Sequence, residues 1–257
     1  MNRSCQVAAG VFCLLGALGA AAEPAKKAEA IKPPWQRLLQ GEDAKKAAEQ
    51  ERRLAQWLEA GKFADALKVA QALAALRGQV QGADHWQAVQ ARWAVEALGR
   101  VVGQGDETRK AYAGSLVLAR QAAALEGKGR YRDAQPLQEK LLALRRKVLG
   151  EEHPSTAASY SSVAYNQYVQ GKYPEAEEGH RKALAIKRKV LGEEHPDTAT
   201  SYNNLAYNQA AQGKYKEAAE GYRKALAICR KALGEEHPHT ALSYGNLAGN
   251  QSAQGKY

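Results

Sequence analysis

Three histidines recur at a constant spacing of 42 residues and are the first candidates for chemistry. They are His153, His195 and His237, and imidazole is both a common metal ligand and a common acid–base group. Histidines at the same place in successive repeat units lie about one unit apart, on the order of 10 Å at normal helix-packing distances. Zinc holds its ligands at about 2 Å. The spacing argues against a shared metal site, and we expect these histidines to hold the turns between units.

Cys229 is the second candidate, because it is the one cysteine outside the first 22 residues. It stands where the preceding unit has Lys187, and no pattern of catalytic partners accompanies it. We expect a small, half-buried helix residue rather than a nucleophile. The sequence also has no phosphate-binding Gly-rich loop, no paired-histidine metal motif and no serine or cysteine nucleophile motif. We therefore predict no catalytic, cofactor or metal site, and expect that the protein is not an enzyme.

The elements that position these residues come from an internal repeat. The string Leu-Gly-Glu-Glu-His-Pro begins at Leu149, Leu191 and Leu233, and Gly-Lys-Tyr follows each time at a fixed distance. Residues 149–190 and 191–232 are identical at 30 of 42 positions. A single repeated unit with short-range contacts favours a solenoid over a globular domain.

Each unit is predicted to be a pair of helices. In the second unit Asp197 or Thr198 is a suitable cap for helix A, which runs to about residue 212, where Gly213 ends it. Helix B is expected over residues 216–233. Its inward stripe, read from the 3.6-residue period, is Ala218, Tyr222, Ala225, Leu226 and Cys229.

Upstream residues repeat the pattern more weakly, with helices expected at 43–60, 64–77, 84–102 and 107–127. We read 43–148 as divergent repeats that cap the N-terminal end of the solenoid, and 149–257 as the regular units, the last one incomplete. Residues 23–42 read as a linker. The chain ends at Tyr257, where another helix B is due, so we expect either a fragment of a longer protein or an end that pairs with another chain.

Residues 1–22 have the features of a secretory signal peptide. Arg3 supplies a positive charge, an apolar stretch follows over residues 7–18, and small alanines at 20–22 offer a cleavage site. We expect an exported protein, periplasmic or extracellular. If the segment stays uncleaved, it anchors the chain to a membrane instead.

The net charge of +10 is concentrated in clusters such as 145–147 and 187–189, one in each unit. We expect these clusters to form a solvated outer helix face. A pair of glutamates follows each cluster, which argues against nucleic-acid binding. Attraction to an acidic partner is the alternative interpretation. No basic groove with interleaved aromatic residues is visible, so we expect no nucleic-acid partner.

The strings at 203–206, 212–215, 217–218 and 225–226, with Tyr222 and the linker at 191–199, resemble the tetratricopeptide repeat, in the 42-residue variety of kinesin light chains. Gln167, Gln209 and Gln251 depart from the pattern, where a large apolar residue is usual. The resemblance implies an all-α fold, an α-solenoid of antiparallel helix pairs wound as a right-handed superhelix. It also implies that helices A line the concave face.

The resemblance assigns peptide binding to the inner face of helices A. Tyrosine offers flat apolar area with a polar tip, and asparagine offers a donor and an acceptor to a peptide backbone. The matching positions are Ser161, Tyr165, Tyr168, Asn203, Asn204, Tyr207 and Asn246.

The predicted function is therefore an exported scaffold that binds a protein or peptide along this face, without a cofactor. Two alternatives remain open at this point. One is an assembly protein that self-associates through its last repeat, and the other is the non-catalytic repeat part of a longer enzyme.

Overall fold

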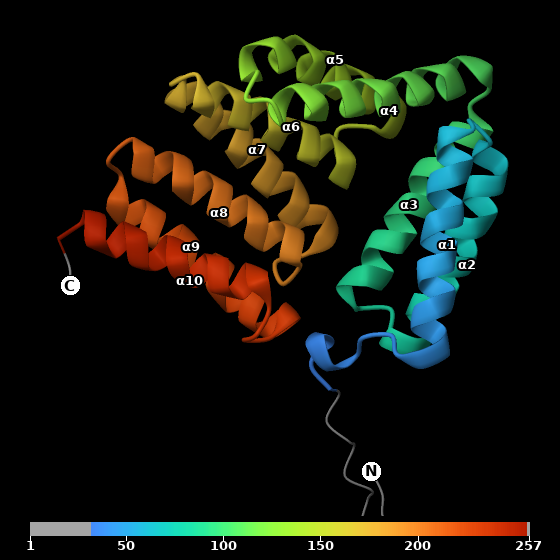
Figure 1. Cartoon of the computed structure of the whole chain (residues 1–257), viewed down its shortest axis with the longest axis horizontal. Coiled ribbons are helices and arrows are strands. Elements are labelled where there is room, and N and C mark those ends of the chain that lie inside the picture. Colours follow the sequence, from blue (N-terminus) through green and yellow to red (C-terminus); the bar gives the residue numbers. More distant parts are fainter. Residues whose placement is uncertain (1–31, 256–257) are drawn as a thin grey trace, which may run out of the picture. The chain divides into compact units, whose positions relative to one another are not determined.

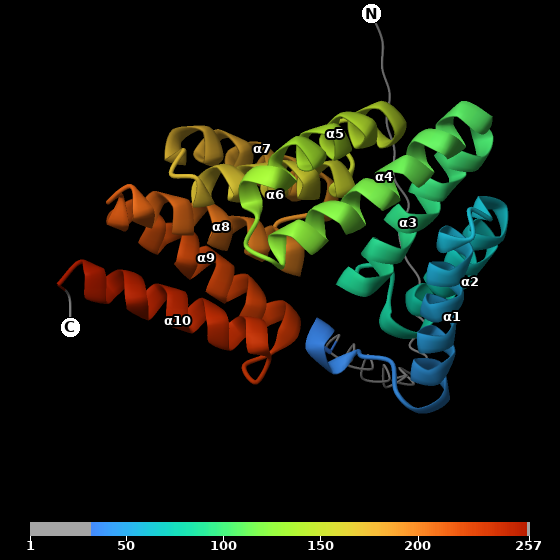
Figure 2. The same ribbon diagram turned by 45° about the horizontal axis from the view of Figure 1, so that its top comes forward.

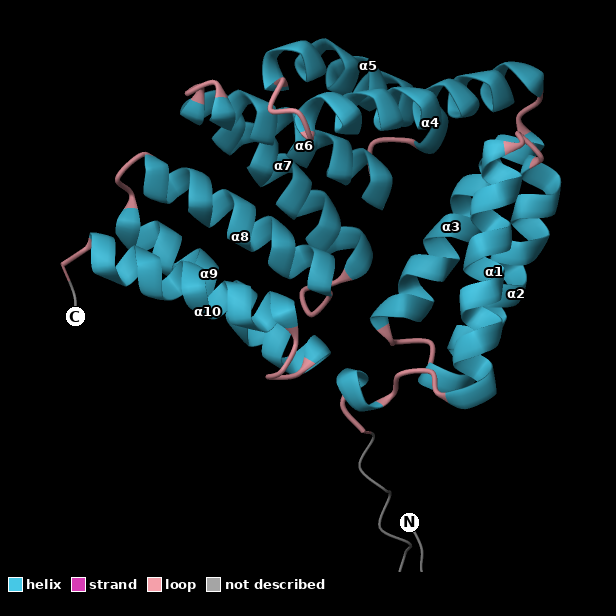
Figure 3. Cartoon of the chain, viewed as in Figure 1, coloured by secondary structure: helices cyan, strands magenta, loops and turns pink. Residues whose placement is uncertain are grey.

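A computed structural model describes residues 32–255 of the chain. This part of the chain is helical and contains no strand (Figure 3). The predicted signal segment, residues 1–22, lies outside the described residues. Among the helices that are described, none is both long and apolar enough to cross a bilayer.

Ten α-helices and one short 3₁₀ helix follow one another along the described residues (Figure 1). Their bounds are η1 Pro34–Gln36, α1 Gly41–Glu59, α2 Phe63–Gln81, α3 Trp86–Gly103, α4 Asp106–Glu126, α5 Tyr131–Leu149, α6 Pro154–Val169, α7 Tyr173–Leu191, α8 Pro196–Ala211, α9 Tyr215–Leu233 and α10 Pro238–Ala253.

The helices pack as consecutive antiparallel pairs. α4 pairs with α5, α6 with α7 and α8 with α9, and each pair also contacts the next helix along the chain. The pairs lie side by side in two views (Figure 2). Gly171 and Gly213 take positive φ angles of 79° and 75° in the turns inside two of the pairs, a conformation that glycine adopts without strain. This arrangement confirms the predicted all-α solenoid, in which α6, α8 and α10 are helices A.

Small residues let the two helices of a pair approach closely. A Cβ added to Gly221 of α9 would lie 2.9 Å from the Cβ of Ala206 on α8, and Gly179 meets Ala164 in the same way one repeat earlier. The predicted inward stripe of α9 is buried, as are Tyr202 and Leu205 of α8. Alanine and glycine therefore set the spacing within a pair, while the larger side chains fill the space between pairs.

Two local predictions need correction. α2 continues to Gln81 instead of ending near residue 77, and it stops at Gly82, whose φ is 93°. The cap of α8 is His195, not Asp197 or Thr198, because its Nδ1 accepts the backbone N–H of Asp197 at 3.0 Å. Pro196 then occupies the first helical position, where its missing N–H costs nothing.

The N-terminal helices depart from the regular pairing. α1 and α2 form a pair, and α3 packs on α2 as a following helix A would. α4 then starts a new pair with α5, so α3 has no helix B of its own within the described chain. Ahead of them, η1 contacts α9, far along the sequence.

Candidate binding surface on helices A

A cleft of about 150 Å³ lies between α8 and α10 and gathers four of the seven predicted residues. Asn203, Asn204 and Tyr207 come from one helix A, and Asn246 comes from the next. They share a wall because residues three or four apart lie on one face of a helix. The lining is Thr200, Asn203, Asn204, Tyr207, Cys229, His239, Leu242 and Asn246.

Tyr165 and Tyr168 of α6 extend this surface from Tyr207. The ring centroids of Tyr168 and Tyr207 are 5.0 Å apart, and those of Tyr165 and Tyr168 are 6.2 Å apart. Tyr165 is 44% exposed and Tyr207 is 50% exposed, so both present ring area to solvent. Six of the predicted residues thus form one continuous strip across α6, α8 and α10.

Two tyrosines missed by sequence reasoning complete the aromatic cluster. Tyr131 of α5 meets Tyr165 edge-on at 5.7 Å, and Tyr173 of α7 lies 5.4 Å from Tyr168. Both stand at the first position of a helix B, so the Gly-Arg-Tyr and Gly-Lys-Tyr turns were the signal for them. Burial raises the pKa of Tyr165, and the neighbouring hydroxyl of Tyr131 adds to the effect. Tyr165 therefore stays neutral at physiological pH.

The amides of the strip differ in what they already bind. The Nδ2 of Asn203 donates to Ser243 Oγ at 3.1 Å and ties α8 to α10. Within residues 32–255, the side-chain amides of Asn204 and Asn246 have no hydrogen-bond partner. These two remain free to bond a ligand.

Ser161, the seventh predicted residue, lies on α6 at the repeat position of Asn203, one turn before Tyr165. Its hydroxyl is buried and has no partner in the described structure. It shares the face of the strip but is not among the residues that line the cleft.

Cys229 lines the cleft and is 3% exposed. Burial raises the pKa of its thiol, although the hydroxyl of Ser243 partly opposes this. A protonated, buried thiol is a poor nucleophile. The position is therefore a buried packing residue, more fully covered than the sequence predicts.

The last two residues of each basic cluster face outward and are paired with glutamates. The first residue is not: Lys187 is buried and donates to the carbonyl of Asp197 at 3.3 Å, and Arg145 is half-buried and donates to Ser159 Oγ at 2.8 Å. Arg188 donates to Glu193 at 2.6 Å within its own repeat, while Lys189 reaches Glu152 of the preceding one. The same pair of contacts recurs 42 residues later with Arg230 and Lys231. The expected solvated outer face is confirmed for these paired residues but not for Arg145 and Lys187. Exposed pairs of this kind stabilise by only about 0–1 kcal/mol each.

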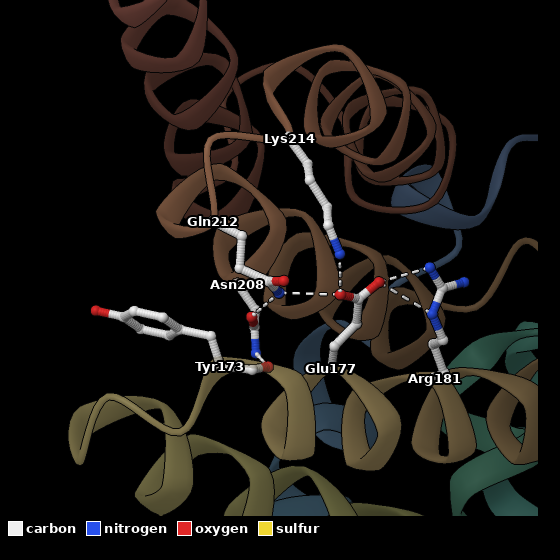
Figure 4. A network of polar contacts seen from close by, with 6 residues as sticks. All are labelled: Tyr173, Glu177, Arg181, Asn208, Gln212 and Lys214. Atoms are coloured by element: carbon white, nitrogen blue, oxygen red, sulfur yellow. Dashed lines mark hydrogen bonds and ion pairs between the residues drawn. The ribbon is translucent and has the colours of Figure 1, made fainter.

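Glu177 of α7 is buried and is the centre of a polar network between two repeats (Figure 4). Its carboxylate accepts bonds from Lys214 at 2.7 Å, Arg181 at 2.6 Å and Gln212 at 2.9 Å. Burial alone would raise its pKa, but these bonds outweigh burial and lower the pKa to about 2.

A repeated asparagine extends the network. Asn208 donates from Nδ2 to the carbonyl of Tyr173 at 3.2 Å, and Asn250 makes the same bond to Tyr215 at 3.0 Å. These side chains are buried and bind the preceding repeat, so they do not contribute to the strip. The spacing of 42 residues was the sequence signal for this role.

The three repeated histidines cap helices. His153, His195 and His237 each accept the backbone N–H two residues later through Nδ1, at 3.0–3.1 Å. This confirms that they hold the turns between repeats. Within residues 32–255, no group of three or more His, Cys, Asp or Glu side chains is arranged to hold a metal ion.

Two solved structures are similar to this chain. A kinesin light chain-like protein of Podosopora anserina, with nearly identical TPR-like repeats, is 24% identical; the match covers 85% of this chain and 90% of that chain, with a TM-score of 0.45. BtubC (BKLC) from P. vanneervenii is 19% identical, with 84% and 86% covered and a TM-score of 0.53, which shows a shared fold. No curated protein matches the sequence.

A family model for the tetratricopeptide repeat matches three overlapping stretches, 112–168, 163–222 and 210–257. Together they span more than half of the chain and coincide with the helix pairs from α4 onward. This chain is a member of the tetratricopeptide repeat family.

Proposed function

We propose that this protein is an exported scaffold that binds an extended peptide or a protein segment along the strip on α6, α8 and α10. Tetratricopeptide repeats generally mediate protein–protein interactions and are typically non-catalytic. The proposal adds the place of binding and the compartment.

The observation that supports it is the continuity of the strip. The exposed rings of Tyr165 and Tyr207 are joined through Tyr168, and the free amides of Asn204 and Asn246 lie beside them. Aromatic area with nearby amides is typical of protein interfaces. No carboxylate, lysine or arginine lines the cleft, so an uncharged stretch of peptide is the best match.

The direct test is selection from a random peptide library with the folded protein as bait. Peptides recovered by the wild type are measured by calorimetry against a Tyr165→Ala, Tyr207→Ala double variant. Truncating interface tyrosines at the centre of a binding surface typically costs more than 1 kcal/mol each. We therefore expect at least a tenfold loss of affinity.

Tyr244→Ala is the matched control. Tyr244 of α10 is 45% exposed, a fraction similar to the 44% of Tyr165. It does not line the cleft, and its hydroxyl donates to Glu235. Peptide affinity should be unchanged in this variant. Equal binding by wild type and the double variant would place the binding site elsewhere.

Export rests on residues 1–22 alone. Expression of the full chain in a bacterial host, followed by fractionation and N-terminal sequencing, tests it. We expect exported protein beginning near residue 23. Full-length protein that stays in the cytoplasm would contradict export without affecting the binding proposal.

A further inference from the structure

Three tryptophans each lie against one of the three turns that connect the regular repeats. These turns, residues 149–154, 191–196 and 233–238, are called the turn row here. Trp93 of α3 meets the first turn, Trp86 of α3 meets the second, and Trp35 of η1 meets the third.

At the first turn, the Trp93 ring meets the His153 ring edge-on with centroids 5.3 Å apart. Arg100, two helical turns further along α3, donates to the carbonyl of Leu149 at 2.8 Å. The guanidinium lies so close to Gly150 that an added Cβ would be 3.2 Å from it. The indole ring of Trp93 and the guanidinium of Arg100, both on α3, therefore both contact this turn.

At the second turn, the Trp86 ring meets the His195 ring edge-on at 6.4 Å. A cavity of about 260 Å³ beside it is lined by both α3 and the turn, and Pro34 also reaches it. The aromatic pair is within the usual range of such contacts.

At the third turn, Trp35 lies over Gly234, where a Cβ would be 3.2 Å from the ring. The segment is anchored at its other side. Pro34 O lies 3.1 Å from Nε2 of His85, and Arg37 binds both the carbonyl of Gln81 at 2.7 Å and the carboxylate of Asp84 at 2.8 Å. Residues 34–37 therefore link the start of α3 to the last turn.

We propose that the turn row is a second interaction surface, distinct from the strip on helices A, which docks one tryptophan per turn and is occupied by this chain's own N-terminal residues 34–103. In the first two turns the histidine has two roles, since it caps a helix through Nδ1 and presents its ring to the tryptophan. In the third turn His237 only caps the helix, and Trp35 lies against Gly234 instead. The occupant is defined by aromatic rings at positions 35, 86 and 93, one facing each turn.

Acid releases this docking. His85, His153 and His195 are buried, and each must be neutral for Nδ1 to accept its backbone N–H. Burial, the largest cause, lowers the pKa of all three. The released form therefore binds more protons, so docking is complete above the ordinary histidine pKa of about 6.5 and is lost as pH falls below it.

Charged groups near the three histidines raise or lower the pKa of each imidazole, but burial is the largest cause and each pKa stays below its ordinary value. Nearby carboxylates favour the protonated imidazole, whereas nearby cations disfavour it. The groups that face the three histidines from the packed elements are Arg37, Arg77, Asp84, Glu96, Arg100, Arg145, Lys187 and Asp197, with His85 also facing His195.

Spin-label distance measurement on the full chain tests the proposal. Labels at Lys46→Cys on α1 and Glu220→Cys on α9, with the natural cysteines replaced by serine, report on the separation of α1 from the repeats. We expect one narrow distance distribution at pH 7.5. Trp35→Ala, and more strongly Trp35→Ala with Trp86→Ala, should broaden and lengthen it.

Two controls separate release from unfolding. Leu38→Ala removes a side chain as exposed as Trp35 but outside the contact with Gly234, and it should leave the distribution narrow. A second label pair at Lys140→Cys and Glu220→Cys lies within the repeats and should not change in any variant. A narrow distribution retained in the Trp35→Ala, Trp86→Ala variant, or equal broadening by Leu38→Ala, would overturn the docking surface.

The test of acid release uses side chains that can cap a helix but do not change charge with pH. Asparagine accepts a capping bond but stays uncharged, so a variant with His85→Asn, His153→Asn and His195→Asn should have the same distribution at pH 7.5 and at pH 5.0, whereas the wild type broadens at pH 5.0. His180→Gln, which replaces a buried histidine of α7 by the residue found 42 positions earlier, should broaden like the wild type. Wild type that stays narrow at pH 5.0, or broadening that persists in the asparagine variant, would overturn acid release.

Discussion

Gly221 shows how a single missing methyl group sets the distance between two helices. It faces Ala206 across the α8–α9 pair, and an added Cβ would lie 2.9 Å from the Ala206 Cβ. Both partners are short and backbone-fixed, so neither can move aside. We expect Gly221→Ala to destabilise the protein by about 1–3 kcal/mol, the usual cost of overpacking a core, in urea unfolding followed by circular dichroism.

Gly245 is the control for that prediction. It lies inside α10, where an added Cβ would meet nothing within 4 Å. Alanine there should be neutral or stabilise by up to about 1 kcal/mol, because glycine is the weaker helix former. Similar destabilisation by both substitutions would refute the close-approach explanation.

Glu177 gives the clearest single-residue test of how the free energy of unfolding depends on pH. Because its pKa falls to about 2 in the folded protein, its stabilisation is present above the ordinary value of 4.5 and is lost as the pH falls towards 2. Glu177→Gln should cost about 1.5–3 kcal/mol at pH 7, the range for hydrogen bonds to a charged group. Unfolding free energies of both proteins should converge near pH 2.

Glu178→Gln changes the neighbouring, exposed carboxylate, which pairs with Lys182. It should have a much smaller effect at every pH. A Glu177→Gln difference that does not depend on pH would show that shape, and not charge, holds the network.

At the scale of elements, the histidine caps fix where each helix A begins. His237→Ala removes the acceptor for the backbone N–H of His239. We expect a loss of about 0.5–2 kcal/mol, as for other N-cap replacements by alanine. His239→Ala keeps that backbone N–H and should be close to neutral; equal losses in the two variants would contradict capping by His237.

The helix pairs could be predicted because the same 42-residue sequence pattern recurs in each unit. A spacing of 42 residues identified the turns, the inward stripe of α9 and the outward basic clusters without any knowledge of the structure. The identity of the cap was missed because a serine, threonine or aspartate near the helix start is the commoner signal. The buried Asn208 was also missed, because polarity alone does not reveal burial.

The packing of the elements that do not repeat could not be predicted from the sequence. α3 follows α2 but has no helix B, and η1 packs against α9 across most of the sequence. No periodicity reports such long-range contacts. For the same reason the sequence predicts a linker over residues 23–42, although Trp35 and Arg37 within it make specific contacts.

At the scale of the whole described chain, the exposed ion pairs of the regular repeats include no residue of the strip. Cations of the outer helices pair with the glutamates of the turns, whereas the strip on α6, α8 and α10 carries tyrosine and asparagine without a carboxylate, lysine or arginine at the cleft. Binding at the strip should therefore depend only weakly on salt, since screening acts on charges. A steep loss of peptide affinity between low and high salt would indicate binding at the outer helices instead.

The most direct measurement of the central claim is amide hydrogen exchange of the protein with and without a peptide selected by it. Binding along the strip predicts slower exchange in α6, α8 and α10, with α5, α7 and α9 changing little. Protection confined to α5, α7 and α9, or to the turns at 149–154, 191–196 and 233–238, would contradict a binding site on helices A.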